Sequence, residues 1–327
     1  MKYIQLNNTD LNISPICLGT AGFGDKSDLE KSFEILNAFV WAGGNFIDTA
    51  NVYCKWLKGH GNCSEQIIGK WLKESGMQGK VIVATKGAHY SFEDPGRSRV
   101  NKEDIRMDLD ESCRTLGKDE MDFYWLHRDD PEKPAEEIVD ILEELKKEGR
   151  IRYYGFSNYR TERLKEIAQC LRERSLSGIT AVSNQWSLAG INPGGNTNPD
   201  PTLVEFSREE YQWHCETGAA SVPFSSTAMG LFFKTSENGA FLYRCRGGCI
   251  LDAGEGNTDC RSFRKYEKIL LERDKSSYLS EAVKAAERNR PQPAGPVPGV
   301  LFPSAIPGCA CNRRQQSFTA KRCTGCL

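Results

Sequence analysis

The sequence contains no long apolar run and almost no excess of charge. None of its hydrophobic stretches reaches the roughly 18 residues of a membrane helix. The first residues, Met1-Lys2-Tyr3, lead into polar side chains rather than into the apolar core of a signal peptide. The 43 Lys and Arg against 44 Asp and Glu give a formal net charge of −1, which provides no broad attraction to nucleic acid or to an anionic membrane. We therefore expect a cytoplasmic protein without nucleic-acid or membrane partners. The sequence predicts no oligomeric state.

Two phosphate-binding motifs are also absent. A glycine-rich stretch, Gly19–Gly24, follows the first predicted strand. No Gly-Lys-Ser/Thr comes after it, as it would in a P-loop, and it does not read Gly-x-Gly-x-x-Gly, as in a dinucleotide-binding Rossmann domain. The sequence therefore argues against both of these nucleotide-binding folds.

The composition is that of a globular protein, with 39% hydrophobic and 27% charged residues over a length of 327. That length suits one large α/β barrel or two ordinary domains. Thirteen cysteines, an odd number spread along the chain, do not form the pattern of a small disulfide scaffold. Six of them are scattered, and we interpret them as ordinary small residues: Cys17, Cys54, Cys63, Cys113, Cys170 and Cys215.

Strand and helix patterns alternate along most of the chain after a short polar hairpin over residues 1–12. The predicted strands cover residues 13–19, 45–50, 81–85, 122–126, 153–156, 179–182 and 220–224. The predicted helices cover residues 28–41, 101–117, 134–147, 161–173 and 201–215, with one more beginning at Ser64. Such alternation means parallel strands joined by right-handed crossovers, in an open doubly wound sheet or in a closed barrel.

Polar side chains end nearly every predicted strand, which is what the catalytic mouth of a barrel requires. These residues are Thr20, Asp48, Lys86, His127, Asn158, Gln185 and Ser225. A barrel needs an eighth strand, for which residues 300–308 are the only good candidate. We therefore predict an α/β protein, a (β/α)8 TIM barrel with an N-terminal β-hairpin.

In a barrel, Asp48, Lys86 and His127 would converge at the ends of neighbouring strands, with Tyr53 reaching over from a loop. An ammonium favours the phenolate and lowers the pKa of a tyrosine, so Lys86 would make Tyr53 a usable proton donor. Asp48 would keep Lys86 charged, and His127 would orient a substrate oxygen. The four suit a reaction that builds negative charge on a carbonyl oxygen.

None of these groups can deliver a hydride, so a cofactor is required. The amides of Asn158 and Gln185 suit the carboxamide of a nicotinamide, and Trp186 offers an aromatic face beside them. Ser225 and Ser226, with Gly230, suit a pyrophosphate. Trp56, Leu57 and Tyr90 are candidates for lining the substrate site, with loop packing as the alternative.

The sequence resembles the aldo-keto reductase family over residues 1 to about 235. The resemblance rests on five segments in the family's order and at its spacings. They are Asp48-Thr49-Ala50-x-x-Tyr53, Ala84-Thr85-Lys86, Asp122-Phe123-Tyr124-Trp125-Leu126-His127, Gly155-Phe156-Ser157-Asn158 and Asn184-Gln185.

The resemblance implies roles for these residues. Tyr53 would be the general acid, tuned by Lys86 and Asp48, and His127 would position the carbonyl. The implied cofactor is NADPH, with NADH as the alternative. Its nicotinamide would contact Thr20, Ala21, Ser157, Asn158, Gln185 and Trp186, and its phosphates Ser225 and Ser226. The hairpin would cover the closed end of the barrel.

Structural roles remain alternatives at each position. Asp48 could cap a helix, His127 could be a structural hydrogen-bonding group, and Trp186 could serve packing alone. Asn158 and Gln185 could satisfy the backbone of their loops instead of a cofactor.

The C-terminal part, residues 235–327, departs from the family, although we predict a single barrel over residues 1–327. Five prolines between Pro291 and Pro303 stand where the family has a helical turn, and proline cannot continue a helix. Arg313 could meet the 2′-phosphate of NADPH. A diverged or damaged tail is favoured over an acquired metal site, whose candidate ligand pairs are Cys309 with Cys311 and Cys323 with Cys326. We predict no metal.

The predicted function is NADPH-dependent reduction of an aldehyde, ketone or open-chain sugar, a small-molecule carbonyl substrate. The alternative is a catalytically weak or inactive regulatory subunit that binds the cofactor on the same barrel.

Overall fold

The computed structural model describes residues 1–187, 200–228 and 302–303. Eight parallel strands form one sheet in the order β10-β3-β4-β5-β6-β7-β8-β9. Their bounds are β3 (Ile16–Gly19), β4 (Phe46–Asp48), β5 (Ile82–Gly87), β6 (Met121–Leu126), β7 (Ile151–Ser157), β8 (Ala181–Ser183), β9 (Ala220–Ser221) and β10 (Phe302–Pro303). The helices are α1 (Leu29–Trp41), α2 (Cys63–Ser75), α3 (Lys102–Leu116), α4 (Ala135–Lys147), α5 (Thr161–Glu173) and α6 (Arg208–Thr217).

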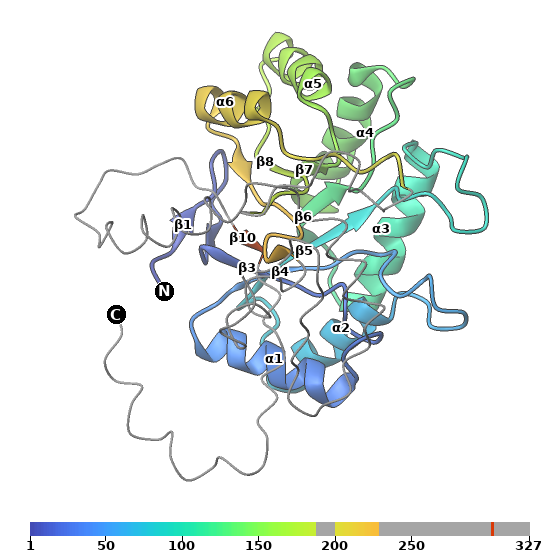
Figure 1. Cartoon of the computed structure of the whole chain (residues 1–327), viewed down its shortest axis with the longest axis vertical. Helices are drawn as coiled ribbons and strands as arrows, with labels where there is room; N and C mark the ends of the chain where they lie inside the picture. The colour runs from blue at the N-terminus through green and yellow to red at the C-terminus, as the bar shows by residue number, and fades with distance from the viewer. Residues whose placement is uncertain (188–199, 229–301, 304–327) are drawn as a thin grey trace, which may run out of the picture.

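The chain winds as a (β/α)8 barrel, as predicted. From β3 to β9 each strand pairs with the next one along the chain, and the helices between them surround the strands (Figure 1). The predicted eighth strand is represented by β10, which pairs with β3 through Phe302 opposite Ile16. Within the described residues, no pair joins β9 to β10.

Alternation along the strands divides the buried side chains into two layers. In β6, Tyr124 and Leu126 belong to the larger cluster, which also holds the apolar faces of the helices. Phe123 and Trp125 belong to a second cluster of buried side chains on the opposite face of the sheet. The two clusters are the outer and inner cores of a barrel.

The predicted N-terminal hairpin is present. Strands β1 (Ile4–Gln5) and β2 (Asn12–Ile13) pair antiparallel, and the turn between them includes Asn8 with a positive φ of 59°. Leu6 and Leu11 of the hairpin join the inner cluster. The hairpin therefore packs against the inside of the barrel.

The helix predicted over residues 201–215 begins later, at Arg208. The Ser207 hydroxyl accepts a hydrogen bond from the Glu210 N–H at 3.0 Å and so caps the helix at that point. Upstream, the Asp200 carboxylate accepts hydrogen bonds from the Thr202 N–H and hydroxyl, which hold a turn. Periodicity alone did not distinguish this turn from a helix.

The interpretation of all six scattered cysteines as ordinary small residues is wrong for two of them. Cys54 and Cys63 form a disulfide with an Sγ–Sγ distance of 2.17 Å. Cys17, Cys113, Cys170 and Cys215 are free. Local sequence could not reveal the bond, because the pairing depends on the fold of the loop between the two residues.

Several predictions lie outside the described residues: the C-terminal part apart from residues 302–303, Gly230, Arg313 and the four cysteines of the metal alternative. Within the described part, no helix is both long and apolar enough to cross a lipid bilayer.

Candidate active site

The ammonium group of Lys86 joins three groups from the end of β4 and the loop that follows it. Its Nζ atom donates to the Asp48 Oδ2 atom, to the Thr49 carbonyl oxygen at 2.8 Å and to the Tyr53 hydroxyl at 3.3 Å. Parallel pairing places these groups together, because Gly19, Asp48 and Ala84 lie side by side in β3, β4 and β5. The residues predicted from strand ends therefore meet at one rim of the barrel.

His127 follows β6 directly, and its ring is a neighbour of the Tyr53 ring. Its backbone N–H donates to the Gly87 carbonyl oxygen at 2.9 Å, and the two ring centroids of His127 and Tyr53 are 6.0 Å apart. Burial, followed by the neighbouring charge of Arg128, holds the pKa of His127 well below its usual value. The imidazole is therefore neutral at neutral pH.

The charged pair determines the electrostatics of the site. Burial opposes a charge on Lys86, but the Asp48 carboxylate and Tyr53 outweigh it and raise the pKa of Lys86. Burial also raises the pKa of Asp48, against the lowering effect of Lys86. We place the proton on Lys86, because its three acceptors stabilise an ammonium.

The pKa of Tyr53 differs in direction from the prediction. Lys86 does lower it, but burial is the larger effect and raises the pKa of the phenol above its ordinary value of 10.0. The sequence could not show how far the hydroxyl would be removed from water. Tyr53 is therefore fully protonated at neutral pH in this structure.

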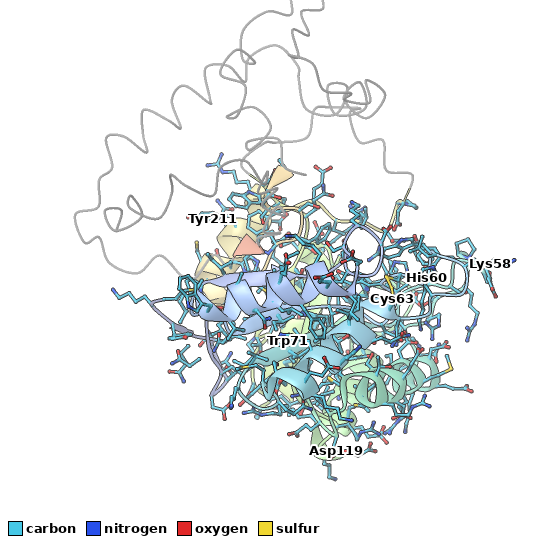
Figure 2. The ribbon with its side chains drawn as sticks, turned by 90° about the horizontal axis from the view of Figure 1, so that it is seen from below. Lys58, His60, Cys63, Trp71, Asp119 and Tyr211 are labelled. Carbon is cyan, nitrogen blue, oxygen red and sulfur yellow. A yellow bond between two sulfur atoms is a disulfide. The ribbon has the colours of Figure 1, made fainter. Side chains whose placement is uncertain are left out.

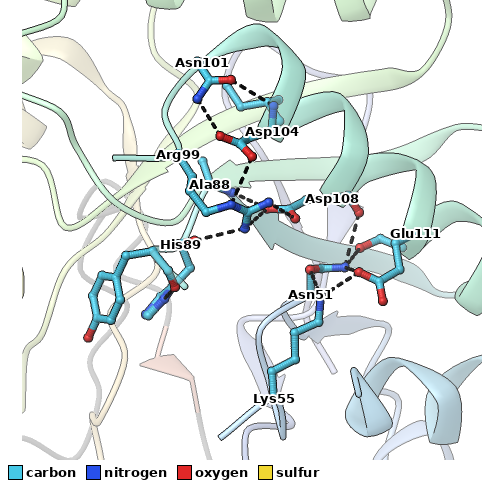
Figure 3. A network of polar contacts seen from close by, with 12 residues as sticks. Asn51, Lys55, Ala88, His89, Arg99, Asn101, Asp104, Asp108 and Glu111 are labelled. Atoms are coloured by element: carbon cyan, nitrogen blue, oxygen red, sulfur yellow. Dashed lines mark hydrogen bonds and ion pairs between the residues drawn. The ribbon is translucent and has the colours of Figure 1, made fainter. Parts of the chain in front are cut away.

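The loop that carries Tyr53 is anchored through Asn51. Its N–H donates to the Lys86 carbonyl oxygen at 2.9 Å. The side-chain amide reaches α3, where it donates to Glu111 at 2.9 Å (Figure 3). Lys55 donates to both Asn51 and Glu111 at 2.6 Å. Tyr53 is thus held between two residues fixed against α3.

A second set of contacts holds the segment after β5. The Asp108 carboxylate accepts from the Ala88 N–H at 2.9 Å and pairs with Arg99, which also donates to the His89 carbonyl oxygen (Figure 3). Ala88 has a positive φ of 63°, a conformation that a non-glycine residue keeps only where its surroundings require it. This network fixes the direction of His89 toward His127.

Five aromatic rings form a closed circuit that includes Tyr53. Consecutive centroids are 6.2 Å apart for Tyr53–Trp56, 6.4 Å for Trp56–Phe92, 5.6 Å for Phe92–His89, 4.9 Å for His89–His127 and 6.0 Å for His127–Tyr53. Of these rings, Trp56 was predicted as a candidate lining residue, whereas His89 and Phe92 were not. Their position directly after the strand end at Lys86 was the available signal.

The predicted nicotinamide contacts lie at the carboxyl ends of β3, β7 and β8. Thr20 follows β3 and its hydroxyl donates to the Asp48 carbonyl oxygen at 2.9 Å, with Ala21 next to it. The Ser157 hydroxyl donates to the Ser183 carbonyl oxygen at 2.8 Å. Both hydroxyls are buried and already donate within the protein, so they would offer a ligand only acceptor capacity.

Asn158 has several partners within the protein. Its amide nitrogen donates to the His127 carbonyl oxygen and to the Ser157 hydroxyl, each at 3.1 Å, and its Oδ1 atom accepts from the Val204 N–H at 3.2 Å. These bonds match the structural alternative for Asn158. A carboxamide could still donate to the second lone pair of Oδ1.

Gln185 and Trp186 lie at the end of β8, both half-buried. The backbone of Gln185 bridges to residues 204–206, and the Trp186 N–H donates to the Phe224 carbonyl oxygen at 3.2 Å. Ser225 and Ser226 follow that carbonyl, with Ser225 at a positive φ of 58°. The predicted phosphate contacts are therefore beside the predicted nicotinamide contacts.

Open space borders these groups. A Cβ atom built on Gly19, in register with Asp48, would have no heavy atom within 4 Å. Amide and hydroxyl side chains around an open barrel mouth are groups that a nicotinamide nucleotide can use. The residues present therefore fit such a cofactor, with Gln185 as the half-buried amide.

A cavity of about 640 Å³ lies against α3, between the segment of residues 51–55 and that of residues 89–99. Lys86 lines it, but Tyr53 and His127 do not. Its charged lining groups include Lys55, Arg99 and Glu111, which are paired with one another or with Asp108. We assign no substrate to it. The described residues contain no cluster of three His, Cys, Asp or Glu groups that could hold a metal ion.

Several known proteins whose names describe oxidoreductases are similar in sequence to this chain. The protein named Uncharacterized oxidoreductase YrpG of Bacillus subtilis (strain 168) is 32% identical over 194 residues, 58% of this chain and 59% of that protein. Aldo-keto reductase YhdN of the same strain is 34% identical over 173 residues, 50% of this chain and 49% of that protein. Aryl-alcohol dehydrogenase [NADP(+)] of Phanerodontia chrysosporium is 27% identical over 296 residues, 84% of this chain and 71% of that protein.

The alignments thus span less than two thirds of the length of both Bacillus relatives. The family model described as Aldo/keto reductase family matches residues 15–244, which include all strands from β3 to β9 and the four rim residues. The chain therefore belongs to the aldo/keto reductase family.

Proposed function

We propose that the protein reduces the carbonyl group of a small molecule to an alcohol, with NADPH as the hydride donor and NADH as the alternative. The observation that carries the proposal is the position of the Lys86 ammonium, within hydrogen-bonding distance of both Asp48 and Tyr53. A buried cation beside a protonated phenol is an arrangement for giving a proton to an oxygen as negative charge develops on it.

The chemistry of the protein groups follows from their protonation. A bound reduced nicotinamide would supply the hydride to the carbonyl carbon. The Tyr53 hydroxyl, protonated at neutral pH, gives its proton to the carbonyl oxygen. Lys86, 3.3 Å away, stabilises the phenolate that remains, and Asp48 keeps Lys86 charged. The neutral imidazole of His127 donates a hydrogen bond that orients the oxygen.

The cofactor would lie across the ends of β7, β8 and β9. Gln185 and the free acceptor capacity of Asn158 would hold the carboxamide, and Trp186 would pack against the ring. Thr20, Ala21 and Ser157 would line the same end, and Ser225 and Ser226 would contact the phosphates. Arg313 would bind the 2′-phosphate of NADPH. We also propose that the protein acts in the cytoplasm.

The substrate that suits the aromatic circuit is a flat carbonyl compound such as an aryl aldehyde. Trp56 and Phe92 are 40% and 45% exposed and belong to the same circuit as Tyr53 and His127, so a planar ring could stack against them. The name of the Phanerodontia relative, an aryl-alcohol dehydrogenase, is consistent with that class.

The test is oxidation of NADPH with a panel of aryl aldehydes, aliphatic aldehydes and open-chain sugars. Tyr53→Phe should lower kcat/KM by about 100-fold or more, because it removes the general acid and keeps the ring. Tyr211→Phe, at an exposed site on α6, is the matched control and should change nothing. Equal rates for wild type and Tyr53→Phe would refute the assignment. Binding of NADPH without turnover of any carbonyl would favour the regulatory-subunit alternative.

A further inference from the structure

The disulfide between Cys54 and Cys63 lies directly beside the proposed general acid. Cys54 follows Tyr53 in the chain, and Cys63 is the first residue of α2. The bond therefore closes the whole loop between the phenol and the helix that follows it. Lys58 and His60 of that loop lie at the edge of the molecule (Figure 2).

The two sulfur atoms also contact the loop after β3. The Sγ atom of Cys54 lies 2.9 Å from the Phe23 carbonyl oxygen, and that of Cys63 lies 3.7 Å from the same atom. A Cβ atom built on Gly24 would come within 2.3 Å of the Cys63 Sγ atom. The disulfide therefore fills the contact between two loops of the barrel mouth, where a side chain on Gly24 would not fit.

The backbone at Cys54 depends on these contacts. Its φ is 75°, in the left-handed region that a residue with a Cβ atom adopts only when its surroundings impose it. The cross-link and the packing of its sulfur against Phe23 impose it here. Without the cross-link, the backbone bonds from Tyr53 to Ala50 and from Leu57 to Cys54, at 3.1 and 2.8 Å, remain. The contacts of Asn51 and Lys55 with Glu111 also remain, but none of these contacts involves the Cys54 sulfur.

The two cysteines differ in their exposure to solvent. Cys54 is fully buried, whereas Cys63 is half-buried at the N-terminus of a helix of 13 residues. The Asn62 side chain makes no capping hydrogen bond at that end of the helix. The accessible sulfur is therefore the one that a thiol reagent can attack.

We propose that Cys54 and Cys63 form a redox modification site that controls the catalytic loop. The oxidised pair holds Tyr53 in its place beside Lys86, and the reduced pair lets Cys54 leave its left-handed conformation and displaces Tyr53. The effect on turnover rests on the proposed function. The effect on the loop does not.

The exchange reaction balances with a dithiol as the reductant. One thiolate of the dithiol attacks the Cys63 sulfur, forms a mixed disulfide and releases Cys54 as a thiolate, which takes up a proton. The second thiolate of the dithiol attacks the sulfur of the first, closes the dithiol to its disulfide and releases Cys63. Two electrons pass from the dithiol to the protein, and an oxidised dithiol reverses the reaction.

The experiment compares the full chain after incubation with oxidised or with reduced dithiothreitol. Peptide mass spectrometry measures the fraction of the protein that carries the 54–63 disulfide in each sample. The rate of tryptic cleavage after Lys58 reports the mobility of the loop and does not require the enzyme to turn over. Reduction should speed that cleavage several-fold and lower kcat by about five-fold or more, because small displacements of a positioned acid are costly. Reoxidation should restore both values.

Two double variants separate the backbone effect from the covalent bond. Cys54→Gly with Cys63→Ser should keep the activity of the oxidised enzyme and ignore dithiothreitol, because glycine accepts a φ of 75°. Cys54→Ser with Cys63→Ser should resemble the reduced enzyme and also ignore dithiothreitol. Cys215→Ser, which removes an exposed free thiol on α6, should stay as sensitive as wild type.

Three results would overturn the proposal. One is a 54–63 pair that stays as thiols after treatment with oxidised dithiothreitol. Another is full activity and unchanged cleavage in protein whose disulfide is shown to be reduced. The third is a glycine variant that loses as much activity as the serine variant. Cleavage that follows the redox state in a chain that reduces no carbonyl would refute the proposed function alone.

Discussion

The Thr85 hydroxyl, one residue before Lys86, donates a hydrogen bond to the carboxyl group of Glu65 in the first turn of α2. Glu65 is fully buried and also accepts from the Asn62 amide at 2.7 Å. Burial raises its pKa from 4.5 to about 7, although hydrogen bonds from Thr85, Ser112 and Asn62 act in the opposite direction. The helix after the catalytic loop is thus joined to the catalytic strand through a carboxyl group that titrates near neutral pH.

This carboxyl group should make stability depend on pH. Below its unfolded pKa of 4.5, Glu65 is protonated in both states and contributes nothing. As pH rises from 4.5 to about 7, only the unfolded chain ionises, so the free energy of unfolding falls. The loss is complete above the folded pKa and amounts to about 3 kcal/mol. Glu65→Gln should remove this loss.

The measurement is the denaturant midpoint of both proteins at pH 5 and pH 8. Wild type should lose more stability than Glu65→Gln between the two values. Glu74→Gln, at an exposed position of the same helix, should follow wild type. An equal loss of stability in wild type and Glu65→Gln between pH 5 and pH 8 would show that the buried carboxyl group does not cause the pH dependence.

Removal of the ammonium from the site should affect both activity and stability. Lys86→Met leaves the Asp48 carboxyl buried without its cation, which costs about 3 kcal/mol or more. It also removes the charge that stabilises the phenolate, so kcat/KM should fall by about 100-fold or more. Thermal unfolding and NADPH oxidation measure the two effects separately.

Lys70→Met is the control for that variant, because Lys70 pairs with Glu74 at an exposed site on α2. Such pairs contribute little to stability. A Lys86→Met enzyme with the kcat/KM of wild type would contradict a role for Lys86 in proton transfer.

Two imidazoles at the site should remain neutral well into the acid range. Burial, then the charge of Arg128, lowers the pKa of His89 to about 4 and that of His127 well below 6.5. In NMR spectra of the labelled protein, neither ring should change its chemical shift between pH 8 and pH 6. A midpoint between these values for His127 would mean that the ring is hydrated, and would contradict its role as a neutral donor.

The sequence predicted the parts of the site that depend on strand ends. Asp48, Lys86 and His127 could be found because parallel pairing brings the carboxyl ends of β4, β5 and β6 to one rim. The spacing of apolar residues likewise predicted α4, whose Ile138, Ile141, Leu142 and Leu145 are all buried.

The sequence did not predict features that depend on distant contacts. The Cys54–Cys63 bond and the left-handed backbone at Cys54 arise from the packing of two loops. The raised pKa of Tyr53 depends on how far its hydroxyl is buried. The late start of α6 depends on the Ser207 cap and the turn at Asp200. None of these has a local periodicity.

The open side of the aromatic circuit should decide between flat and flexible substrates. Trp56 contacts both Tyr53 and Phe92, and its Nε1 atom donates to Asp25 at 3.3 Å, which fixes the orientation of the indole. An aromatic pair contributes about 0.5–1.5 kcal/mol beyond the area it buries. Trp56→Ala should therefore raise the KM for an aryl aldehyde by about 2- to 12-fold and leave that for a short aliphatic aldehyde within about two-fold.

Trp41→Ala removes an indole that is 91% exposed on α1 and should change neither value. The ratio of the two KM values, measured for wild type and both variants, isolates the stacking contribution from general damage to the loop, because damage would raise both values together. An equal rise for the two aldehydes would mean that Trp56 supports the position of Tyr53 rather than the substrate. The aromatic circuit would then be part of the catalytic loop and would not select the substrate.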